Sequence, residues 1–383
     1  MQKKVRIVSI SIVLVILLIG IIMMNNNSNN KYSFIQDGIK YAITLDGNKV
    51  TSFPPKGMYK AQVTCEGADG RWLYDDWKLA IENITSDDVT CDINFSTITK
   101  TNLNDYIISL AGTTQGTGEV VNENGYRYEG KNPNNYIWFN NEYWRIIGVF
   151  DSASHGKSGK NLVKIIRAET LDFLAWHKSG ENYWTASSLK LLLNGAYYNA
   201  QDGTSSGYCY GYSTTATANC DYTKRGIQSG YRGMIANVTW YLGGCSNERS
   251  TAKDFYECER GTTVCSGRPT STTGYIGLMY PSDYAYSVLA SSCARTKMVG
   301  GYSGEECAGQ SWLYGKGHEW TLTTTYPYCY DAYNVNYVGY TSMGNGTRNG
   351  YGSRPVLYLD ASVYKIDGDG SLKNPFIVGM WYA

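Results

Sequence analysis

The sequence predicts an α+β fold in which short antiparallel strands outnumber helices. The chain of 383 residues contains 42 glycines and 35 tyrosines, a composition typical of turn-rich β proteins. Alternating apolar and polar residues recur in short runs, whereas few segments show the periodicity of an amphipathic helix. The length also allows for more than one folding unit, each with its own core.

Charge and histidine content exclude several classes of function. Lys and Arg number 34 and Asp and Glu 33, so no overall positive field attracts nucleic acid. His155, His177 and His318 are far apart in the sequence, and we interpret each as a packing or surface residue. We therefore expect no cofactor, no metal site and no nucleic-acid partner.

The start of the chain is predicted to anchor it in a membrane. Residues 7–24 are uncharged and rich in Ile, Val and Leu, which is long enough for a spanning helix. Basic residues precede this run and favour a cytoplasmic amino terminus: Lys3, Lys4 and Arg6. No small-residue cleavage site follows, which favours an uncleaved signal anchor over a signal peptide. Residues 1–30 would form the anchor and a polar spacer of a single-pass cell-membrane protein, with the bulk extracytoplasmic.

The ten cysteines are predicted to form disulfides, because they are even in number and show no Cys-x-x-Cys spacing. An extracytoplasmic location would allow such bonds to persist. Strand parity favours a Cys65–Cys91 bond, and short loops favour Cys209–Cys220 and Cys293–Cys307. A Cys258–Cys265 bond is a further hypothesis. Two cysteines remain as a long-range pair or as free thiols: Cys245 and Cys329.

Residues 31–100 are predicted to form a small β-sandwich-like module. Residues 39–45 alternate between apolar and polar side chains and lead into a turn at 46–48. Similar runs surround Val63, Leu79 and Ile93. Trp72 and Trp77 are available to fill the space between two sheets.

Residues 101–118 are predicted to form a helix and a linker. Asn102 can cap a helix that carries Leu103, Tyr106, Ile107 and Leu110 on one side. Gly112 then ends the helix, because glycine tolerates a positive φ. Residues 113–118 are expected to be the linker.

Residues 119–383 are predicted to form the main α+β domain. Residues 136–139 and 143–150 have the pattern of a hairpin, and residues 162–167 that of a further strand. A helix capped by Thr185 is expected to end at Asn194 and Gly195, and a second helix is expected over residues 225–237. The remaining expected strands lie at 275–280, 320–324, the tyrosine-rich stretch up to 340, and 355–359.

Catalytic motifs are weak throughout, and no catalytic residue is nominated. Residues 203–207 match G-x-S-x-G, but no strand leads into this motif and no helix follows it. Residues 367–370 resemble the start of a calcium loop, but Val378 stands where a glutamate is needed. Four carboxylates are candidates for a glycosidase pair that spacing cannot select: Glu305, Glu306, Glu319 and Asp331.

Residues 326–352 have the most unusual composition in the chain. Seven tyrosines, together with asparagines, lie among Gly, Ser and Thr, a mixture that antibody loops use for contact. Ordinary strand residues flank this stretch, so we expect a recognition surface held between two rigid strands. The alternative is that these tyrosines only cover the core. The candidate ligand-binding residues are Tyr328, Tyr330, Tyr333, Asn334, Asn336, Tyr337 and Tyr340.

Five segments carry a resemblance to a known family: NYIWFNNEYWRIIGVF (135–150), WTASSLKLLLN (184–194), GYIGLMYPSDYAY (274–286), HEWTLTT (318–324) and SRPVLYL (353–359). They resemble a family of exported Firmicutes surface proteins, some described as prepilin-like, whose carboxyl-terminal domain is similar to the C-type-lectin-like fold. In that fold, targets of diversity-generating retroelements carry a hypervariable patch before a G-x-R-like ending. Residues 326–349 and 352–354 stand at the corresponding positions.

The chain also departs from the relatives of that fold. The calcium-dependent sugar motifs of true C-type lectins are absent, and Cys329 does not match the cysteine arrangement of formylglycine-generating enzymes. The processing motif of a prepilin is missing too. The resemblance therefore does not imply calcium-mediated sugar binding or catalysis.

Together, these features predict a membrane-anchored, receptor- or adhesin-like protein on the surface of a Gram-positive cell, not an enzyme. Its partner would be a protein or a glycan ligand. Two alternatives are a structural or pseudopilus-like surface component and a carbohydrate-active enzyme.

Overall fold

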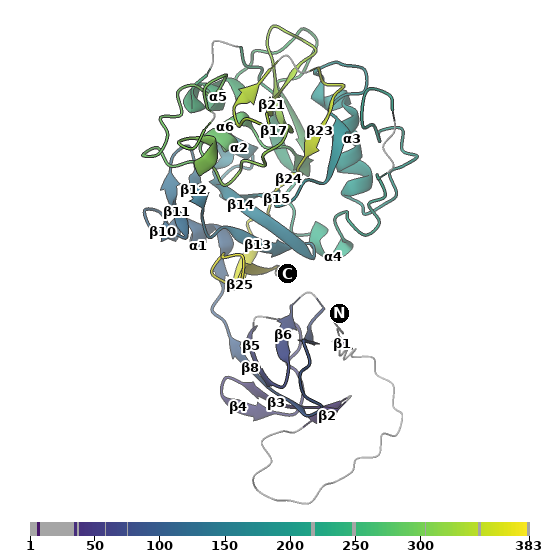
Figure 1. Cartoon of the computed structure of the whole chain (residues 1–383), viewed down its shortest axis with the longest axis vertical. Coiled ribbons are helices and arrows are strands. Elements are labelled where there is room, and N and C mark those ends of the chain that lie inside the picture. The colour runs from purple at the N-terminus through teal and green to yellow at the C-terminus, as the bar shows by residue number, and fades with distance from the viewer. Residues whose placement is uncertain are drawn as a thin grey trace, which may run out of the picture. The chain divides into compact units, whose positions relative to one another are not determined.

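The computed structural model describes residues 6–7, 34–36, 38–57, 59–74, 76–215, 219–246, 250–302, 304–343 and 346–380. The chain divides into two compact units, Met1–Lys100 and Thr101–Ala383 (Figure 1). This division falls where the predicted β module ends. Strands outnumber helices among the described residues, as the sequence predicts, and the described helices all belong to the second unit.

The first unit consists of two sheets that share one core. The larger sheet has the order β2-β3-β8-β5, with β4 paired to β3, and the smaller has the order β1-β7-β6. The predicted strand over residues 39–45 is β3, and the turn after it has positive φ at Asp46 and Gly47. The strands are β1 (Arg6–Ile7), β2 (Phe34–Gln36), β3 (Ile39–Leu45), β4 (Asn48–Val50), β5 (Tyr59–Glu66), β6 (Asp69–Leu73), β7 (Lys78–Glu82) and β8 (Val89–Thr97).

Aromatic side chains fill the core of the first unit, as the tryptophans had suggested. Trp72 is buried, and its ring meets Phe95 at 4.9 Å and Trp77 at 5.3 Å, both edge to face. Such pairs add to the stabilisation from burial alone. The core takes Ile43 from the larger sheet and Ile81 from the smaller, so the arrangement is sandwich-like.

The membrane-spanning helix expected over residues 7–24 is not supported. Ile7 ends the short strand β1, which pairs with β7, and residues 8–24 lie outside the described residues. Among the residues that the structure describes, no helix is long and apolar enough to cross a membrane.

The second unit is built on an eleven-stranded sheet, of which eight strands have the order β10-β11-β12-β14-β13-β26-β25-β9. The other three continue from β14: β15 pairs with β14, β24 with β15, and β19 with β24. The predicted hairpin is β13–β14, and the predicted strand over residues 162–167 is β15. The strands are β9 (Thr101–Asn102), β10 (Thr114–Gln115), β11 (Thr117–Asn122), β12 (Tyr126–Asn132), β13 (Tyr136–Phe139), β14 (Glu142–Phe150), β15 (Leu162–Arg167), β19 (Ile276–Gly277), β24 (Val356–Tyr358), β25 (Val363–Asp367) and β26 (Phe376–Met380).

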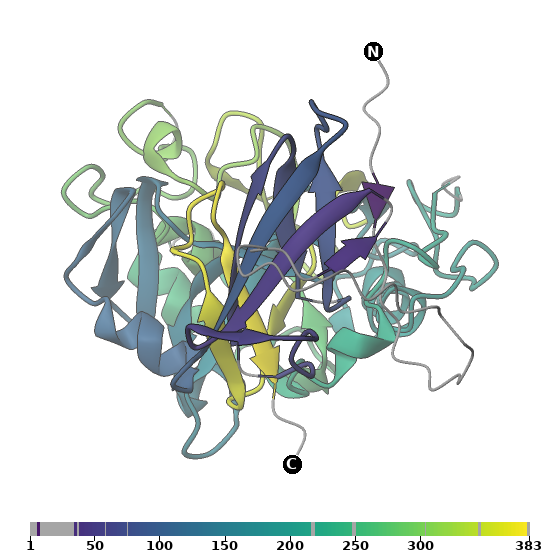
Figure 2. The same cartoon turned by 90° about the horizontal axis from the view of Figure 1, so that it is seen from below.

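The first and last strands of this unit are neighbours. β9 pairs with β25, and β26 runs parallel to β13, so the yellow carboxyl-terminal strands in Figure 2 belong to the same sheet as the blue strands at the start of the unit. The predicted helix is α1 (Leu103–Ser109), which buries Leu103 and Ile107, although Asn102 makes no side-chain capping bond. The expected linker at 113–118 instead carries β10 and the start of β11, which pair with each other.

A second, five-stranded sheet has the order β16-β23-β20-β21-β22 and carries most of the tyrosine-rich segment. Its strands are β16 (Asp172–Ala175), β20 (Glu319–Thr324), β21 (Ala332–Val335), β22 (Thr341–Ser342) and β23 (Gly350–Ser353). A separate pair is formed by β17 (Val238–Tyr241) and β18 (Ser271–Gly274).

The helices are shorter than predicted and begin at other residues. Ser187, not Thr185, caps α3 (Ser188–Leu192), and its hydroxyl accepts a bond from the Lys190 amide at 3.1 Å. The helix does not end at Asn194 and Gly195 but continues as a π-helical turn, η2 (Leu193–Tyr197). Of the helix expected over residues 225–237, only α4 (Ser229–Arg232) is present. The other helices are α2 (Ser152–His155), η1 (Trp184–Ala186), α5 (Ala252–Glu259), α6 (Pro281–Ala285) and η3 (Ala308–Gln310).

All ten cysteines lie in the described part of the chain and are paired. The predicted bonds Cys65–Cys91, Cys209–Cys220 and Cys293–Cys307 are confirmed. The predicted Cys258–Cys265 bond is wrong, and so is the treatment of Cys245 and Cys329 as a pair or as free thiols. The actual bonds are Cys245–Cys258 and Cys265–Cys329.

A network of buried charges lies inside the second unit. Asp283 accepts bonds from Arg127, at 3.2 Å, and from Lys164. Glu129 pairs with Arg295. Burial raises the pKa of Glu129 to about 7, against the opposing effect of Arg295.

Candidate functional site

The tyrosine-rich segment follows β20 and crosses the five-stranded sheet as β21 and β22. Trp320 on β20 lies opposite Asn334 on β21, which in turn lies opposite Ser342 on β22. The loops on either side of β21 carry the exposed tyrosines. The segment therefore presents two groups of side chains, one before β21 and one after it.

Tyr328 and Tyr330 form the first exposed group. They are 44% and 56% exposed, and their ring centroids are 6.3 Å apart. Asn182 holds the loop beneath them, because its Nδ2 donates to the carbonyl oxygens of Thr325, Tyr328 and Asp331 at 3.1, 3.0 and 2.9 Å. The Cys265–Cys329 disulfide fixes the same loop between the two tyrosines.

Tyr337 forms the second exposed group at the turn after β21. It is 66% exposed, and its ring lies 5.4 Å from that of His318, which stacks on Tyr351 at 4.6 Å. Asn336 builds the turn, since its Oδ1 accepts bonds from the amides of Val338 and Gly339, each at 3.0 Å.

Two further tyrosines hold this turn in place through hydrogen bonds to its backbone. The hydroxyl of Tyr314 donates to the Tyr337 carbonyl and that of Tyr284 to the Gly339 carbonyl, both at 2.6 Å. The backbone that presents Tyr337 is thus held at two points. The two exposed groups stand at opposite ends of β21. We call the side chains of Tyr328, Tyr330 and Tyr337 together the tyrosine surface.

Three of the predicted ligand-binding residues are buried: Tyr333, Asn334 and Asn336. Tyr333 packs edge to face on Phe255 at 5.1 Å, and its hydroxyl donates to the Cys245 carbonyl at 3.3 Å. The Asn334 side chain forms hydrogen bonds with His318 and Ser342. The Asn336 side-chain oxygen already accepts hydrogen bonds from the backbone of its own turn. Both faces of β21 are covered, so these side chains support the surface instead of forming it. The last predicted residue, Tyr340, is half-buried against the core.

The other candidate carboxylates are buried or lie at the surface. Glu319 is buried in an ion pair with Arg354, and burial raises the pKa of Asp331. Glu305 and Glu306 are exposed. Across the described residues, no group of three or more His, Cys, Asp or Glu side chains could hold a metal ion.

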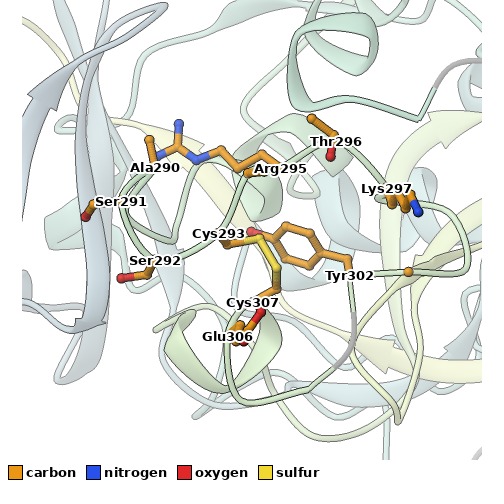
Figure 3. Close-up of a pocket in the computed structure, with 12 residues that line it drawn as sticks. Ala290, Ser291, Ser292, Cys293, Arg295, Thr296, Lys297, Tyr302, Glu306 and Cys307 are labelled. Carbon is orange, nitrogen blue, oxygen red and sulfur yellow. A yellow bond between two sulfur atoms is a disulfide. The ribbon is translucent and has the colours of Figure 1, made fainter.

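One cavity, of about 390 Å³, lies within the loop over residues 290–307. Figure 3 shows the Tyr302 ring beside the Cys293–Cys307 disulfide, with Lys297 on the other side of the cavity. The two largest polar groups in its wall are engaged elsewhere. Arg295 pairs with Glu123 and Glu129, and the Tyr302 hydroxyl donates to the Ala285 carbonyl at 2.8 Å. The other charged residues of the wall, Lys297 and Glu306, are exposed, and small residues and backbone form the rest.

A larger cavity, of about 660 Å³, was not predicted from the sequence. Aromatic and arginine side chains line it, including Trp138, Arg145, Trp312 and Arg354. We call it the arginine cleft. The sequence signal was the alternation within residues 136–145, which places every second side chain of the hairpin on its outer face.

No protein-family model matches the chain, and neither a curated protein nor a solved structure matches it. Its function must therefore be inferred from the chain's own geometry. Exposed aromatic rings on tethered loops can contact a partner with little loss of conformational freedom.

Proposed function

We propose that this protein is a membrane-anchored, cell-surface binding protein of the receptor or adhesin type, without catalytic activity. Its tyrosine surface would contact a protein or glycan ligand. The proposal depends on one observation: three large aromatic side chains, 44 to 66% exposed, stand on loops that hydrogen bonds and a disulfide hold in place.

Physical chemistry favours recognition at such a surface. Tyrosine contributes a large apolar area and a hydroxyl through only two rotatable side-chain bonds, so ordering it costs little entropy. Aromatic residues also dominate the binding energy of known interfaces. Because Asn182 and Asn336 already fix the loops, a ligand would not have to order them.

The location is part of the proposal. Five disulfides favour an oxidising, extracytoplasmic compartment. The apolar run at residues 7–24 would supply the membrane anchor, and Arg6 and Ile7 would then have to leave their pairing with β7 in the membrane-bound protein. The second unit would adopt a C-type-lectin-like fold, as the resemblance to exported Firmicutes proteins implies, and short helices beside antiparallel strands are compatible with that fold.

The test is a triple variant in which Tyr328, Tyr330 and Tyr337 are all replaced by Ala. Wild-type full chain in detergent micelles would be applied to an array of purified glycans and purified extracellular proteins. We expect a specific ligand for the wild type and at least a tenfold loss of affinity for the variant. Its melting temperature should stay close to that of the wild type, because exposed positions contribute little to stability.

Two further variants serve as controls. Tyr212→Ala removes a tyrosine that is 59% exposed outside the tyrosine surface, and it should bind normally. Tyr333→Ala removes a buried ring and should lower the free energy of unfolding by about 3–5 kcal/mol. If the wild type binds nothing on the array, or if the triple variant binds as well as the wild type, the proposal is wrong. A triple variant as unstable as Tyr333→Ala would show that these tyrosines serve packing.

A further inference from the structure

The outer face of the β13–β14 hairpin forms one wall of the arginine cleft. Tyr136 lies opposite Arg145 and Trp138 opposite Tyr143, so all four side chains share one face. The rings of Trp138 and Tyr143 meet edge to face at 5.1 Å. The alternate residues on the other face belong to the core, so the hairpin is a rigid wall.

Trp312, Tyr314 and Leu372 line the same cavity from other segments of the chain. The volume of about 660 Å³ is in the range of sites for small organic molecules. Leu372 is exposed at its rim. The cleft thus combines apolar walls with enough space for a ligand of a few tens of atoms.

Arg145 is only 8% exposed, yet it forms no ion pair with any described residue. Its guanidinium lies 4.2 Å from the Tyr136 ring centre and 4.7 Å from that of Trp312. Its Nε donates to Asn135 at 2.7 Å, and its Nη2 donates to the Pro133 carbonyl at 3.2 Å. Nη1 donates to no residue in the described part of the chain.

Arg354 adds a second guanidinium to the cleft, but its charge is balanced by the buried ion pair with Glu319. Its Nε and Nη2 bind Glu319 and the Leu313 carbonyl, while its Nη1 donates to none of the described residues. Burial, together with the charge of Arg354, lowers the pKa of Arg145 to about 10, although Tyr136 opposes this shift.

Arg167, the third arginine of the cleft, likewise contributes no free charge. Arg167 is neutralised by Glu142, with 2.6 Å between Nη2 and Oε2. Glu169 also lines the cleft, but its side chain is exposed. What is left is the buried cation of Arg145, with an unused N–H edge. Burying such a charge without a counter-ion is costly, so an anion in the cleft would be stabilising.

We propose that the arginine cleft is a second binding site, separate from the tyrosine surface, for the carboxylate of a small organic acid. The unused Nη1 groups of Arg145 and Arg354 would donate to the carboxylate oxygens. Trp138 and Tyr143 would cover an apolar ring or chain of the same molecule. Both an aromatic acid and a sugar acid have this combination of a carboxylate and an apolar face.

The binding test uses matched pairs of probes, titrated calorimetrically into the full chain in detergent micelles. One pair is indole-3-acetate and its neutral amide, and the other is glucuronate and glucose. We expect one acid or both to bind about 10- to 100-fold more tightly than its neutral partner, because hydrogen bonds to charged groups contribute most of the affinity. The pair with the larger difference in affinity shows whether the cleft prefers an aromatic acid or a sugar acid.

Variants locate the site. Arg145→Gln should lose the preference for the acid over its neutral partner. Because Arg145 is buried, exposed Leu372 offers a variant that leaves the fold intact: Leu372→Glu should weaken acid binding by repulsion, while Leu372→Gln should not. Tyr143→Ala should weaken binding, while Tyr212→Ala should leave it unchanged.

Several outcomes would overturn the proposal. One is the absence of binding by either acid up to about 10 mM, where even a weak site would be seen. Another is equal affinity for the acids and their neutral partners. Acid binding that is the same in Leu372→Glu and Leu372→Gln would also exclude this cleft.

Discussion

Glu129 is a single carboxyl group whose surroundings affect the pH dependence of the whole second unit. It is buried beside Arg295, and its Oε1 has no hydrogen-bond partner among the described residues. Burial raises its pKa to about 7 from an ordinary value of 4.5. Between pH 4.5 and about pH 7, Glu129 keeps its proton in the folded protein but releases it in the unfolded chain.

We therefore expect the stabilisation from a protonated Glu129 to be present below about pH 4.5 and to be lost as the pH rises to about 7. Glu129→Gln should show a shallower fall in the free energy of unfolding between pH 5 and 7. Urea denaturation at several pH values would measure it. Some slope should persist, because burial also raises the pKa of Glu259 to about 7.

The control for this prediction is Glu306→Gln, which changes an exposed glutamate. It should follow the wild-type pH profile. If Glu129→Gln follows that profile as well, the proton uptake does not occur at Glu129.

At the same scale, the sequence could identify the tyrosine-rich segment but not which of its residues are exposed. Tyr333 and Asn334 look no different in the sequence from Tyr330 or Tyr337. They are buried because β21 lies within a sheet and α5 residue Phe255 covers Tyr333. Burial on both faces of a strand depends on packing from distant parts of the chain, which no local pattern encodes.

Among the elements, the loop that carries Tyr328 and Tyr330 is held by a disulfide. Cys265 and Cys329 are separated by 64 positions and join this loop to the segment after α5. Replacing both by Ala should lower the free energy of unfolding by about 4 kcal/mol in the chain-entropy model. Calorimetry of the double variant would measure the loss.

The same variant tests the tyrosine surface. Freed from its disulfide, the loop has to be ordered by the ligand, so affinity should fall even at temperatures where the variant is fully folded. As a control, replacing Cys209 and Cys220 by Ala removes a disulfide that does not bear the exposed tyrosines. An unchanged ligand affinity in the Cys265/Cys329 variant would show that the disulfide does not preorganise the surface.

Strands could be predicted from the sequence better than helices or disulfides. β3 follows from local alternation, whereas β15 and the strands of the β13–β14 hairpin follow from short apolar runs. Residues 225–237 have apolar side chains at helical spacing, and those residues are buried, but mostly in loops that pack on the core. The Cys245–Cys258 pair could not be predicted, because it depends on where α5 docks.

At the scale of the whole molecule, each unit has a hydrophobic core of its own. We expect two calorimetric transitions in the full chain. Replacing Cys65 and Cys91 by Ala should lower one of them, by about 3–4 kcal/mol in free energy, because this bond closes a segment of the first unit only.

The other transition should stay where it is in the Cys65/Cys91 variant. The Cys265/Cys329 variant should show the reverse pattern. A single transition that moves in both variants would mean that the two units unfold together.

The pairing of β9 with β25 brings the beginning and the end of the second unit close together. Only β25 separates β9 from β26, so about 10 Å, two strand spacings, lies between their backbones. A short bridge could join these strands, and the exposed residues 157–160 could then be cut to give new ends. Such a circular permutant would keep every strand pairing of the second unit. Its new ends, in the loop between β14 and β15, could carry a fused protein.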